Sequence, residues 1–310
     1  MSSVDALGCA REGFARSSPS LRLDTDRALG PLTTYRVGGA ADLFVSCATE
    51  RDLDEVARVV SLCGVDVLVV GNGSNLLVSD RGFRGVAIVL GDAFDFVVIV
   101  GHELRAGGAT RLPVVARRTA AAGLAGFEWA VGVPGTIGGA IRMNAGGHGS
   151  DIARTLISAD IVDVRRATRS TRRASQLDLR YRHSNLEPCD VVVEARFALT
   201  RGDSVRSLAE VAEIVRWRRE NQPGGQNAGS VFTNPPGDSA GRLIDRAGCK
   251  GLRVGSAHVS TKHANFFIAD DGGSADDVFA LMREVRRRVR DVHGVELTAE
   301  TQLVGFPEGL

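Results

Sequence analysis

Lysine is nearly absent from this chain of 310 residues, since only Lys250 and Lys262 occur among its 38 basic side chains and the others are arginine. The basic residues are almost balanced by 37 acidic ones, which leaves a formal net charge of +1. Proteins that bind nucleic acid need a strong positive field to hold the phosphate backbone, and a balanced chain does not supply one. We therefore expect no nucleic-acid partner, and the sequence gives no sign of an obligate protein partner.

Long apolar runs are missing as well. The sequence has no stretch of about 18 apolar residues, so we expect no transmembrane helix and no contact with a membrane. The first 25 residues contain several charged side chains and no apolar core, which argues against a secretory signal. Together these absences predict a cytoplasmic protein.

Paired cysteines and metal-binding motifs are also absent. No two cysteines form a CxxC pair, and an odd number of them in a chain without a signal peptide predicts reduced, mostly buried thiols. The six histidines form no HExxH motif and no cluster with cysteine, so we expect no metal site. The five cysteines are Cys9, Cys47, Cys63, Cys189 and Cys249.

The composition that remains is that of an ordinary globular protein, 44% hydrophobic and 24% charged, which at this length predicts two domains or three small ones. Thr49 with Asp52 three residues on predicts a helix start, and a last helix is predicted between Ser274 and Gly294. Polar residues 201–203 mark a boundary before another long helix. Residues 1–29 are predicted to be irregular, a further helix is predicted at 110–123 with Thr110 as its cap, and strands are predicted at 43–45, 65–70, 86–90, 96–100, 157–164, 191–199 and 295–303.

Two glycine-rich segments are candidates for ligand binding. The first, at 71–75, follows a predicted buried strand, where glycines let the backbone approach a ligand and present N–H groups to a pyrophosphate. It is not a Rossmann fingerprint, because Leu76 stands where the third glycine belongs, and a tight turn explains it equally well. The second, at 132–149, is expected to lack regular structure. Its interleaved apolar residues argue against a flexible linker and favour a binding role.

Three polar positions have only weak support from the local pattern. Arg182 has the planar fork that suits a carboxylate or phosphate, but in so arginine-rich a chain the local pattern strongly favours an ordinary surface arginine. Ser230 lies outside any GxSxG elbow, and its segment also fits a turn leading into a strand. Glu300 lies on the polar side of the last predicted strand, where periodicity alone favours a solvent-facing carboxylate.

Taken in order, however, these segments resemble the UDP-N-acetylenolpyruvoylglucosamine reductase family over nearly the whole chain. Each motif is weak alone, and their order and spacing make the resemblance specific. The shorter branch of the family is indicated, because an extra tyrosine-bearing loop is lacking. The motifs are TTYRVGGAAD at 33–42, VGNGSNLLV at 70–78, GFE at 126–128, GVPGTIGG at 132–139, MNAG at 143–146, YRHS at 181–184, GSVFTNP at 229–235 and STKHANF at 260–266.

The resemblance implies an α+β fold. A lead-in at 1–29 is expected to precede a two-lobed FAD-binding domain of the vanillyl-alcohol-oxidase (PCMH) type at 30–200. A C-terminal α+β domain at 201–310 is expected to bind substrate. The resemblance leaves open whether the last strand, at 295–306, returns to the first lobe.

The resemblance also implies an activity, that of a UDP-N-acetylmuramate dehydrogenase, an oxidoreductase acting on CH–CH bonds with NADP+ as acceptor. NADPH would reduce non-covalently bound FAD, which would then reduce UDP-N-acetylglucosamine enolpyruvate to UDP-N-acetylmuramate. This step belongs to peptidoglycan precursor synthesis, and so to cell wall biogenesis, cell shape and cell division. The alternative is another FAD-dependent oxidoreductase or oxidase on the same scaffold.

Site residues follow from the same resemblance. Arg182 matches the active-site arginine, Ser230 the proton donor and Glu300 the catalytic glutamate of the family. At Thr233 many members carry lysine, for which Lys250 or Lys262 could substitute. The residues expected to bind FAD are Gly71, Asn72, Gly73, Ser74, Asn75, Gly132, Pro134, Gly135, Thr136, Gly138, Asn144, Ala145 and Gly146, and those expected to bind substrate are Tyr181, Asn234 and Lys262.

Overall fold

A computed structural model describes residues 3–17 and 21–307 of the chain. The chain divides into two compact units that are interleaved along the sequence. The N-terminal unit consists of the residues up to Asp26, Asp42–Asn72 and Gly85–Trp217, and the C-terminal unit of Arg27–Ala41, Gly73–Arg84 and the residues from Arg218 onward. The division of labour between an FAD-binding and a substrate-binding domain stays a prediction at this point.

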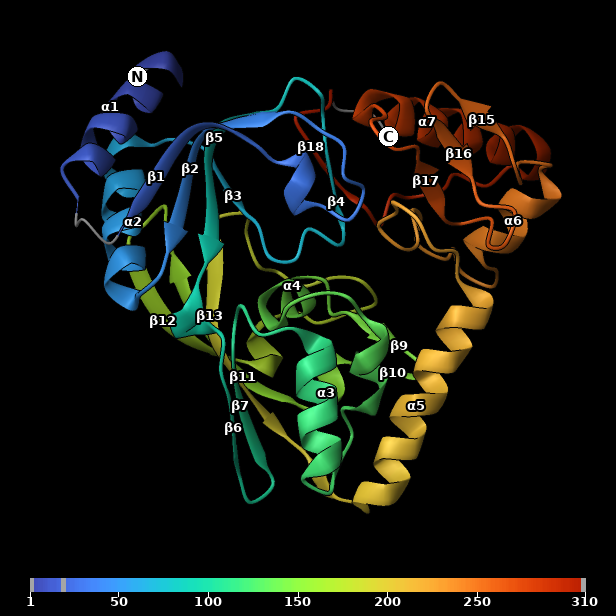
Figure 1. The fold of residues 1–310 in the computed structure, drawn as a ribbon, viewed down its shortest axis with the longest axis horizontal. Helices are drawn as coiled ribbons and strands as arrows, with labels where there is room; N and C mark the ends of the chain where they lie inside the picture. Colours follow the sequence, from blue (N-terminus) through green and yellow to red (C-terminus); the bar gives the residue numbers. More distant parts are fainter. Residues whose placement is uncertain (1–2, 18–20, 308–310) are drawn as a thin grey trace. The chain divides into compact units, whose positions relative to one another are not determined.

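The first sheet of the N-terminal unit has four strands in the order β1-β2-β5-β3, with β3 parallel to β5. Helices α1 and α2 pack together beside this sheet (Figure 1) and share its apolar core. Thr49 and Asp52 form the predicted capping box at the start of α2, which confirms that helix. The bounds are α1 Ser3–Ala15, β1 Arg22–Ala28, β2 Ala40–Cys47, α2 Glu50–Cys63, β3 Val67–Val69 and β5 Phe83–Leu90.

The second sheet of the N-terminal unit has five strands in the order β12-β11-β13-β7-β6, and every neighbouring pair is antiparallel. Helices α3 and α4 cover its apolar core together with the first part of α5. The bounds are β6 Val97–Val100, β7 Glu103–Gly107, α3 Leu112–Ala121, α4 Ile137–Arg142, β11 Leu156–Asp163, β12 Thr168–Arg173, β13 Asp190–Ala198 and α5 Ser204–Asn221, with the short pairs β8 Leu124–Ala125 and β14 Thr200–Arg201, and β9 Gly146–Gly147 and β10 Ser150–Asp151.

The C-terminal unit is built on a three-stranded sheet, β15-β16-β17, against which α7 packs. Ser274 caps α7 and Gly294 ends it at a φ of +67°, so the predicted last helix is confirmed at both ends. A parallel pair of strands, β4 and β18, joins the segment after the first glycine loop to the end of the chain. The bounds are β4 Leu76–Val78, α6 Ala240–Arg246, β15 Arg253–Val254, β16 Ala257–Val259, β17 Phe267–Ala269, α7 Ala275–His293 and β18 Gln302–Val304, and the 3-10 helices of the chain are Gly30–Leu32, Asp92–Phe94, Glu128–Gly132, Ile152–Arg154 and Ala174–Gln176.

Several elements differ from the sequence-based prediction. Within the segment predicted to be irregular, residues 3–15 form α1, because the helix buries Ala10 and Phe14 in the apolar core. Residues 22–28 form β1, because they pair with β2 at the edge of the first sheet. Thr110 does not cap α3, since its hydroxyl donates to the carbonyl of Phe96 at 3.0 Å and Arg111 takes the N-cap position. The glycine-rich stretch at 132–149 contains the short helix α4, capped by Thr136.

The predicted strand at 295–303 is mostly irregular. Its residues pair with different partners in turn, so no continuous ladder forms. Thr298 and Glu300 bond to the backbone near Val231, and only Gln302–Val304 form a strand, beside β4. Residues 302–304 pair with residues 76–78 of the same C-terminal unit, and a return of the last strand to the first lobe stays a prediction.

A disulfide joins Cys9 of α1 to Cys63 of α2, with a Cα–Cα distance of 5.7 Å. The prediction that all thiols are reduced is therefore wrong for this pair. The two residues are 54 positions apart and belong to no motif, so their proximity follows only from the packing of the two helices. The other three cysteines, Cys47, Cys189 and Cys249, are free and buried, as predicted.

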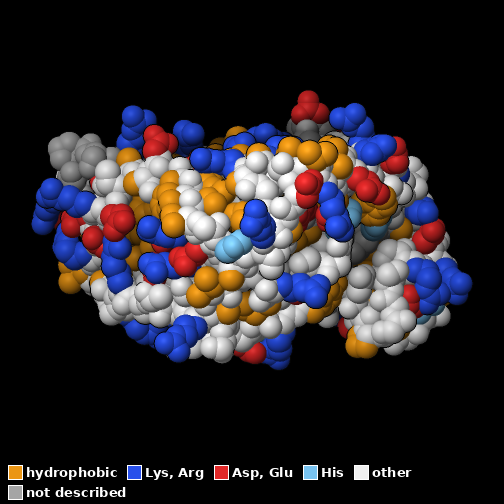
Figure 2. Space-filling view, turned by 90° about the horizontal axis from the view of Figure 1, so that it is seen from below, with side chains coloured by type: hydrophobic (Ala, Val, Ile, Leu, Met, Phe, Trp, Pro, Cys, Tyr) orange, Lys and Arg blue, Asp and Glu red, His pale blue; other side chains and the backbone are white. Residues whose placement is uncertain are grey.

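The surface mixes both charge signs. On the face drawn in Figure 2, basic and acidic side chains are interspersed and hydrophobic ones form small groups, in keeping with the near-zero net charge. Within residues 3–17 and 21–307, no helix combines the length and apolar character that crossing a membrane requires.

Candidate active site

The two glycine-rich segments meet inside the N-terminal unit. A Cβ atom on Gly71 would lie 2.7 Å from the Thr136 hydroxyl, so only glycine allows this approach. The side-chain amide of Asn72 donates to the carbonyl of Pro134. The two segments are thereby held together by the side chains of Thr136 and Asn72, and glycine-rich backbone of this kind can present N–H groups to a phosphate-bearing cofactor.

Gly73, in the first glycine-rich segment, belongs to the C-terminal unit and packs closely against Leu32. It has a φ of +59°, and a Cβ atom there would lie 2.1 Å from the carbonyl oxygen of Leu32. The backbone N–H of Thr34 donates to the carbonyl of Gly73 at 3.2 Å. The hydroxyl of Thr34 is buried and has no hydrogen-bond partner among the described residues. Because a buried hydroxyl without a partner is destabilising, a polar ligand at the loop would satisfy it, and the loop therefore fits FAD.

Two other predicted FAD ligands, Asn75 and Gly138, have structural roles. The Asn75 side chain donates to the carbonyl of Glu300 at 3.0 Å, and its own carbonyl accepts from the N–H of Gln302 at 2.9 Å. Gly138 donates to the carbonyl of Gly108 at 2.9 Å, in a place where a Cβ atom would contact that same carbonyl. Whether either residue also touches a cofactor stays a prediction.

Asn144 and Gly146 support the turn that carries Arg182. Asn144 is only 2% exposed, and its side-chain amide donates to the carbonyl of Arg180 at 2.9 Å and to the carboxylate of Asp151 at 3.3 Å. The carbonyl of Gly146 accepts from the Arg182 guanidinium at 3.0 Å. The side chain of Asn144 is therefore engaged by protein groups, its backbone N–H donates to the carbonyl of Ile141 at 3.1 Å, and its role in binding FAD stays a prediction.

Arg182 lies at the tip of a tight turn in the N-terminal unit. The backbones of Arg180 and His183 exchange two hydrogen bonds of 3.0 Å across it. The φ of Arg182 is +55°, an unusual conformation for a residue with a long side chain. Its guanidinium lies 5.2 Å from the ring of Tyr181, which is 57% exposed. The turn thus holds a half-buried cation next to an accessible aromatic ring.

Ser230 and Glu300 lie on neighbouring backbone segments of the C-terminal unit. The N–H of Glu300 donates to the carbonyl of Val231 at 2.8 Å, and Phe232 is bridged to Ala299. Ser230 is bridged on its other side to Phe266. Both side chains are half-buried, and the bond from Asn75 to Glu300 ties this pair of segments to the first glycine loop. A serine hydroxyl and a carboxylate are therefore carried on adjacent, hydrogen-bonded backbone segments.

The predicted substrate ligands of the C-terminal unit are exposed. Asn234 accepts from the N–H of Ala240 at 3.0 Å, and the ammonium of Lys262 donates to the carbonyl of Arg219 at 2.8 Å. The hydroxyl of Thr233 donates to the carbonyl of Thr298 at 3.3 Å. The ammonium of Lys250 lies 2.8 Å from the carboxylate of Asp245, and the substitution of Lys250 or Lys262 for the lysine expected at Thr233 stays a prediction.

Sequence reasoning missed two features of this region. Thr34 stands inside the motif at 33–42, so that motif could have pointed to it. The other feature is a ring contact between His148 and Trp217 of α5, with centroids 5.1 Å apart, and no pattern in the sequence indicates it.

Similarity to known proteins agrees with this geometry. A family model described as an FAD binding domain matches residues 41–168. The fold is also similar to that of "Physcomitrella patens BBE-like 1 wild-type", which is 14% identical with a TM-score of 0.55 over 95% of this chain and 90% of that chain. The chain is thus an FAD-binding protein built on an α+β fold that contains a PCMH-type FAD-binding unit.

The match of the C-terminal residues identifies the family within the FAD-binding proteins. Residues 221–304 match the model for the UDP-N-acetylenolpyruvoylglucosamine reductase C-terminal domain. The reductase of that name from Rubrobacter xylanophilus is 42% identical over 91% of this chain and 95% of its own length, and that from Heliobacterium modesticaldum is 44% identical over 89% of each. The crystal structure of the enzyme from Thermus caldophilus is 34% identical, with a TM-score of 0.81 over 92% of this chain and 99% of that one. The chain belongs to the UDP-N-acetylenolpyruvoylglucosamine reductase family.

Proposed function

We propose that this chain reduces UDP-N-acetylglucosamine enolpyruvate to UDP-N-acetylmuramate, with NADPH as the reductant, in the cytoplasmic part of peptidoglycan precursor synthesis. The observation that carries the proposal is family membership along nine-tenths of the chain, combined with suitable residues at all three catalytic positions. The UDP-sugar is the expected partner molecule. An oxidase of alcohols or sugars on the same scaffold would account for the glycine loops, but it would leave Ser230 and Glu300 without a role.

The FAD-binding residues follow from the two loops. Gly71 and Gly73 allow close approach of backbone, and Thr34 offers an unsatisfied hydroxyl beside them. Pro134 and Thr136 belong to the second loop, which is bonded to the first. When bound there, FAD supplies the hydride carrier that this reaction needs.

Arg182 is proposed to bind the substrate carboxylate. Hydride addition to the methylene carbon of the enolpyruvyl group places negative charge on the neighbouring carbon, which bears the ether oxygen and the carboxylate. That charge spreads into the carboxylate. A guanidinium offers two parallel N–H groups to both oxygens, which stabilises this charge as it develops. The Arg182 side chain already has one N–H bonded to Gly146, so its direction is fixed before substrate arrives.

Ser230 is proposed to donate the proton that completes the reaction. Its hydroxyl can transfer a proton to the carbon on which charge develops, and Glu300 on the next segment can orient the reacting groups. General-acid catalysis of this kind contributes typically about 10²–10⁴-fold to a rate. The backbone bond from Glu300 to Val231 keeps the two residues in register with each other.

The visible spectrum of the purified protein tests this proposal. We expect an oxidised flavin spectrum that is bleached by NADPH without oxygen and restored by UDP-N-acetylglucosamine enolpyruvate. An oxidase would instead consume oxygen with simple alcohols and without NADPH, and that result would contradict the proposal. Acid precipitation of the same sample should release all of the flavin, because the cofactor is expected to bind non-covalently, whereas flavin in the pellet would show a covalent link.

A further inference from the structure

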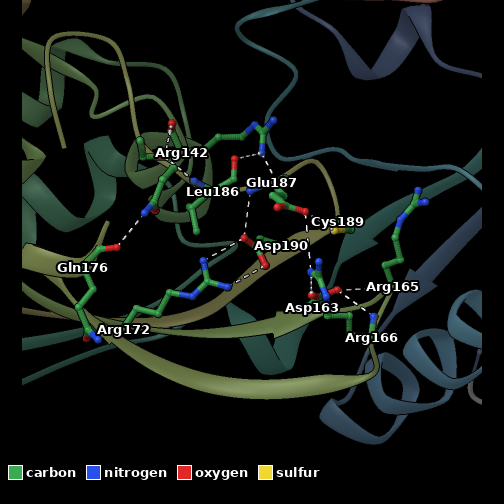
Figure 3. A network of polar contacts seen from close by, with 12 residues as sticks. Arg142, Asp163, Arg165, Arg166, Arg172, Gln176, Leu186, Glu187, Cys189 and Asp190 are labelled. Carbon is green, nitrogen blue, oxygen red and sulfur yellow. Dashed lines mark hydrogen bonds and ion pairs between the residues drawn. The ribbon is translucent and has the colours of Figure 1, made fainter. Parts of the chain in front are cut away.

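Arg142 is the last residue of α4, inside the second glycine segment, and its side chain bonds to the backbone at 186–187. One N–H group of its guanidinium donates to the carbonyl of Glu187 at 2.8 Å and to that of Leu186 at 3.3 Å (Figure 3). Burial lowers the pKa of this guanidinium, and the nearby carboxylate of Asp190 opposes that shift. Partial burial of a charged side chain costs solvation free energy, which an exposed arginine does not lose. The bonds from Arg142 to backbone carbonyls therefore indicate a specific contact.

The backbone carbonyl of Arg142 also contacts the segment after Arg182. It accepts a hydrogen bond of 2.7 Å from the hydroxyl of Ser184, a buried residue only two positions after Arg182. The Ser184 hydroxyl accepts in turn from the N–H of Leu186 at 3.4 Å. Both ends of Arg142 therefore hold the segment at 184–187.

The far side of this segment is fixed by a second network. The Asp190 carboxylate accepts from the N–H of Glu187 at 3.0 Å and from the guanidinium of Arg172 at 3.2 and 3.3 Å (Figure 3). Asn144 holds the other flank of the turn through the carbonyl of Arg180. The backbone is thus held both before and after Arg182. Asn144 bonds to residue 180, before Arg182, and Arg142 bonds to residues 184–187, after it.

We propose that Arg142 is a positioning residue for Arg182: it ties the end of the flavin-binding segment to the loop that carries the carboxylate-binding arginine. This inference rests on the proposed function of Arg182. A residue with φ of +55° needs surrounding contacts to keep its conformation. Arg142 supplies such contacts, so the guanidinium of Arg182 meets the substrate carboxylate at a set place.

The competing interpretation is that Arg142 only stabilises the fold. Stabilisation acts on the whole N-terminal unit, so its loss would lower flavin content and slow both half-reactions alike. Positioning acts through Arg182, so its loss affects the step in which the enolpyruvyl carboxylate is bound. The two interpretations therefore predict different kinetics for the same variants.

The experiment uses flavin-loaded full-length protein carrying Arg142→Met, Arg182→Ala or both. Methionine keeps part of the length of the side chain and removes its charge and its hydrogen bonds, and flavin content and the thermal midpoint of each variant show whether the fold is retained. Arg117→Met is the matched control, because Arg117 also donates to a backbone carbonyl, that of Pro113 at 3.1 Å, on the exposed side of α3. Stopped-flow absorbance measures flavin reduction by NADPH and flavin reoxidation by the enolpyruvyl substrate separately.

We expect Arg142→Met to slow reoxidation by about 10–100-fold, as a small misplacement of a catalytic group does, and to change reduction by NADPH less than about threefold. In the Arg182→Ala background, Arg142→Met should slow reoxidation no further, because its effect passes through Arg182. Arg117→Met should behave like the wild type. Equal slowing of both half-reactions, or additive losses in the double variant, would overturn the proposal.

Hydrogen exchange of the same proteins separates this inference from the proposed function. Arg142→Met should speed exchange of the amides of His183 and Leu186, which depend on the clamped turn. Faster exchange together with unaffected kinetics in both Arg142→Met and Arg182→Ala would refute the role given to Arg182. Unchanged exchange in Arg142→Met would show that Arg142 does not hold the turn and would refute the positioning role itself.

Discussion

Arg182, the proposed carboxylate-binding residue, has a backbone conformation that an arginine rarely adopts. Holding a long side chain at a φ of +55° costs about 1–3 kcal/mol and persists only where surrounding contacts determine it. Hydrogen bonds made by Asn144, Gly146 and Ser184 around the turn hold Arg182 in this conformation. A residue kept in this state at the expense of stability is better explained by a functional role than by a place among surface arginines.

Substituting Arg182 by lysine tests whether the shape of the cation matters. We expect Arg182→Lys to lower turnover by about 10²-fold or more, nearly as much as Arg182→Ala, with a smaller change in substrate affinity. The reason is that an ammonium is a point charge and cannot bond both carboxylate oxygens in one plane. Steady-state kinetics measure this, with Arg180→Lys in the same turn as control. A lysine variant with nearly normal turnover would mean that charge alone suffices or that Arg182 is outside the site.

Ser230 offers a test that separates the two halves of the reaction. We expect Ser230→Ala to leave flavin reduction by NADPH nearly intact and to slow reoxidation by the enolpyruvyl substrate at least about 10²-fold. The reduction step needs no proton at the sugar's side chain, whereas the reoxidation step does. Stopped-flow measurement of both halves decides the matter. If both slow equally, Ser230 is not the proton donor.

At the scale of elements, the disulfide fixes α1 to α2. A cross-link closing a loop of this length stabilises a protein by about 2–4 kcal/mol, mainly by restricting the unfolded chain. Disulfides are rare in reducing compartments, so its formation depends on the redox state that the protein meets. The helix α1 is therefore held both by apolar packing and by a bond that a reductant can remove.

We expect dithiothreitol to lower the thermal midpoint of the wild-type protein, because reduction releases the link between α1 and α2. The double variant Cys9→Ser, Cys63→Ser should have the lower midpoint from the start and should not respond to the reductant. Differential scanning calorimetry with and without dithiothreitol measures both. A wild-type midpoint unaffected by complete reduction would show that packing alone holds α1.

Asp277 links the start of α7 to the turn between β15 and β16. Its carboxylate accepts from the N–H and the hydroxyl of Ser256 at 2.8 and 2.7 Å, and these bonds lower the pKa of Asp277 below its usual 3.8. A lowered folded-state pKa means that the contribution to stability is present above the usual value and is lost as pH falls through the folded value. Ionised Asp277 therefore stabilises the C-terminal unit at neutral pH.

Asp277→Asn is expected to flatten the dependence of stability on pH. The unfolding free energy of the wild type should fall more steeply than that of the variant as pH drops below about 4, because only the wild type must protonate this carboxyl. Urea unfolding at a series of pH values measures the difference between the two proteins. Parallel curves would show that the bonds to Ser256 do not depend on ionisation.

Elements with strong local signals could be predicted, and those defined by distant partners could not. Helices α2 and α7 were foreseen because Thr49, Ser274 and Gly294 are cap residues whose chemistry acts within a few positions. Helix α1, strand β12 and the break in the segment before β18 depend on packing against remote residues. The pairing of Cys9 with Cys63 also depends on residues that are distant in the sequence, so it could not be predicted.

At the scale of the whole molecule, the order of the motifs was the decisive sequence information. Arg182, Ser230 and Glu300 each lacked support from local periodicity and gained it from the family resemblance, which similarity along most of the chain confirmed. The sequence could not show the turn at Arg182 or its clamping by Arg142, because both arise from segments that meet only in the fold. It also did not show that residues 27–41 and 73–84 join the C-terminal unit.

The central claim is that this molecule transfers reducing equivalents from NADPH to an enolpyruvyl UDP-sugar, and product analysis under anaerobic conditions tests it most directly. Flavin-loaded protein is mixed with NADPH and UDP-N-acetylglucosamine enolpyruvate, and the sugar nucleotide is identified by mass spectrometry while NADPH absorbance is followed. We expect one UDP-N-acetylmuramate for each NADPH consumed. NADPH oxidation without any change in the mass of the sugar nucleotide, or no NADPH oxidation at all, would contradict the claim.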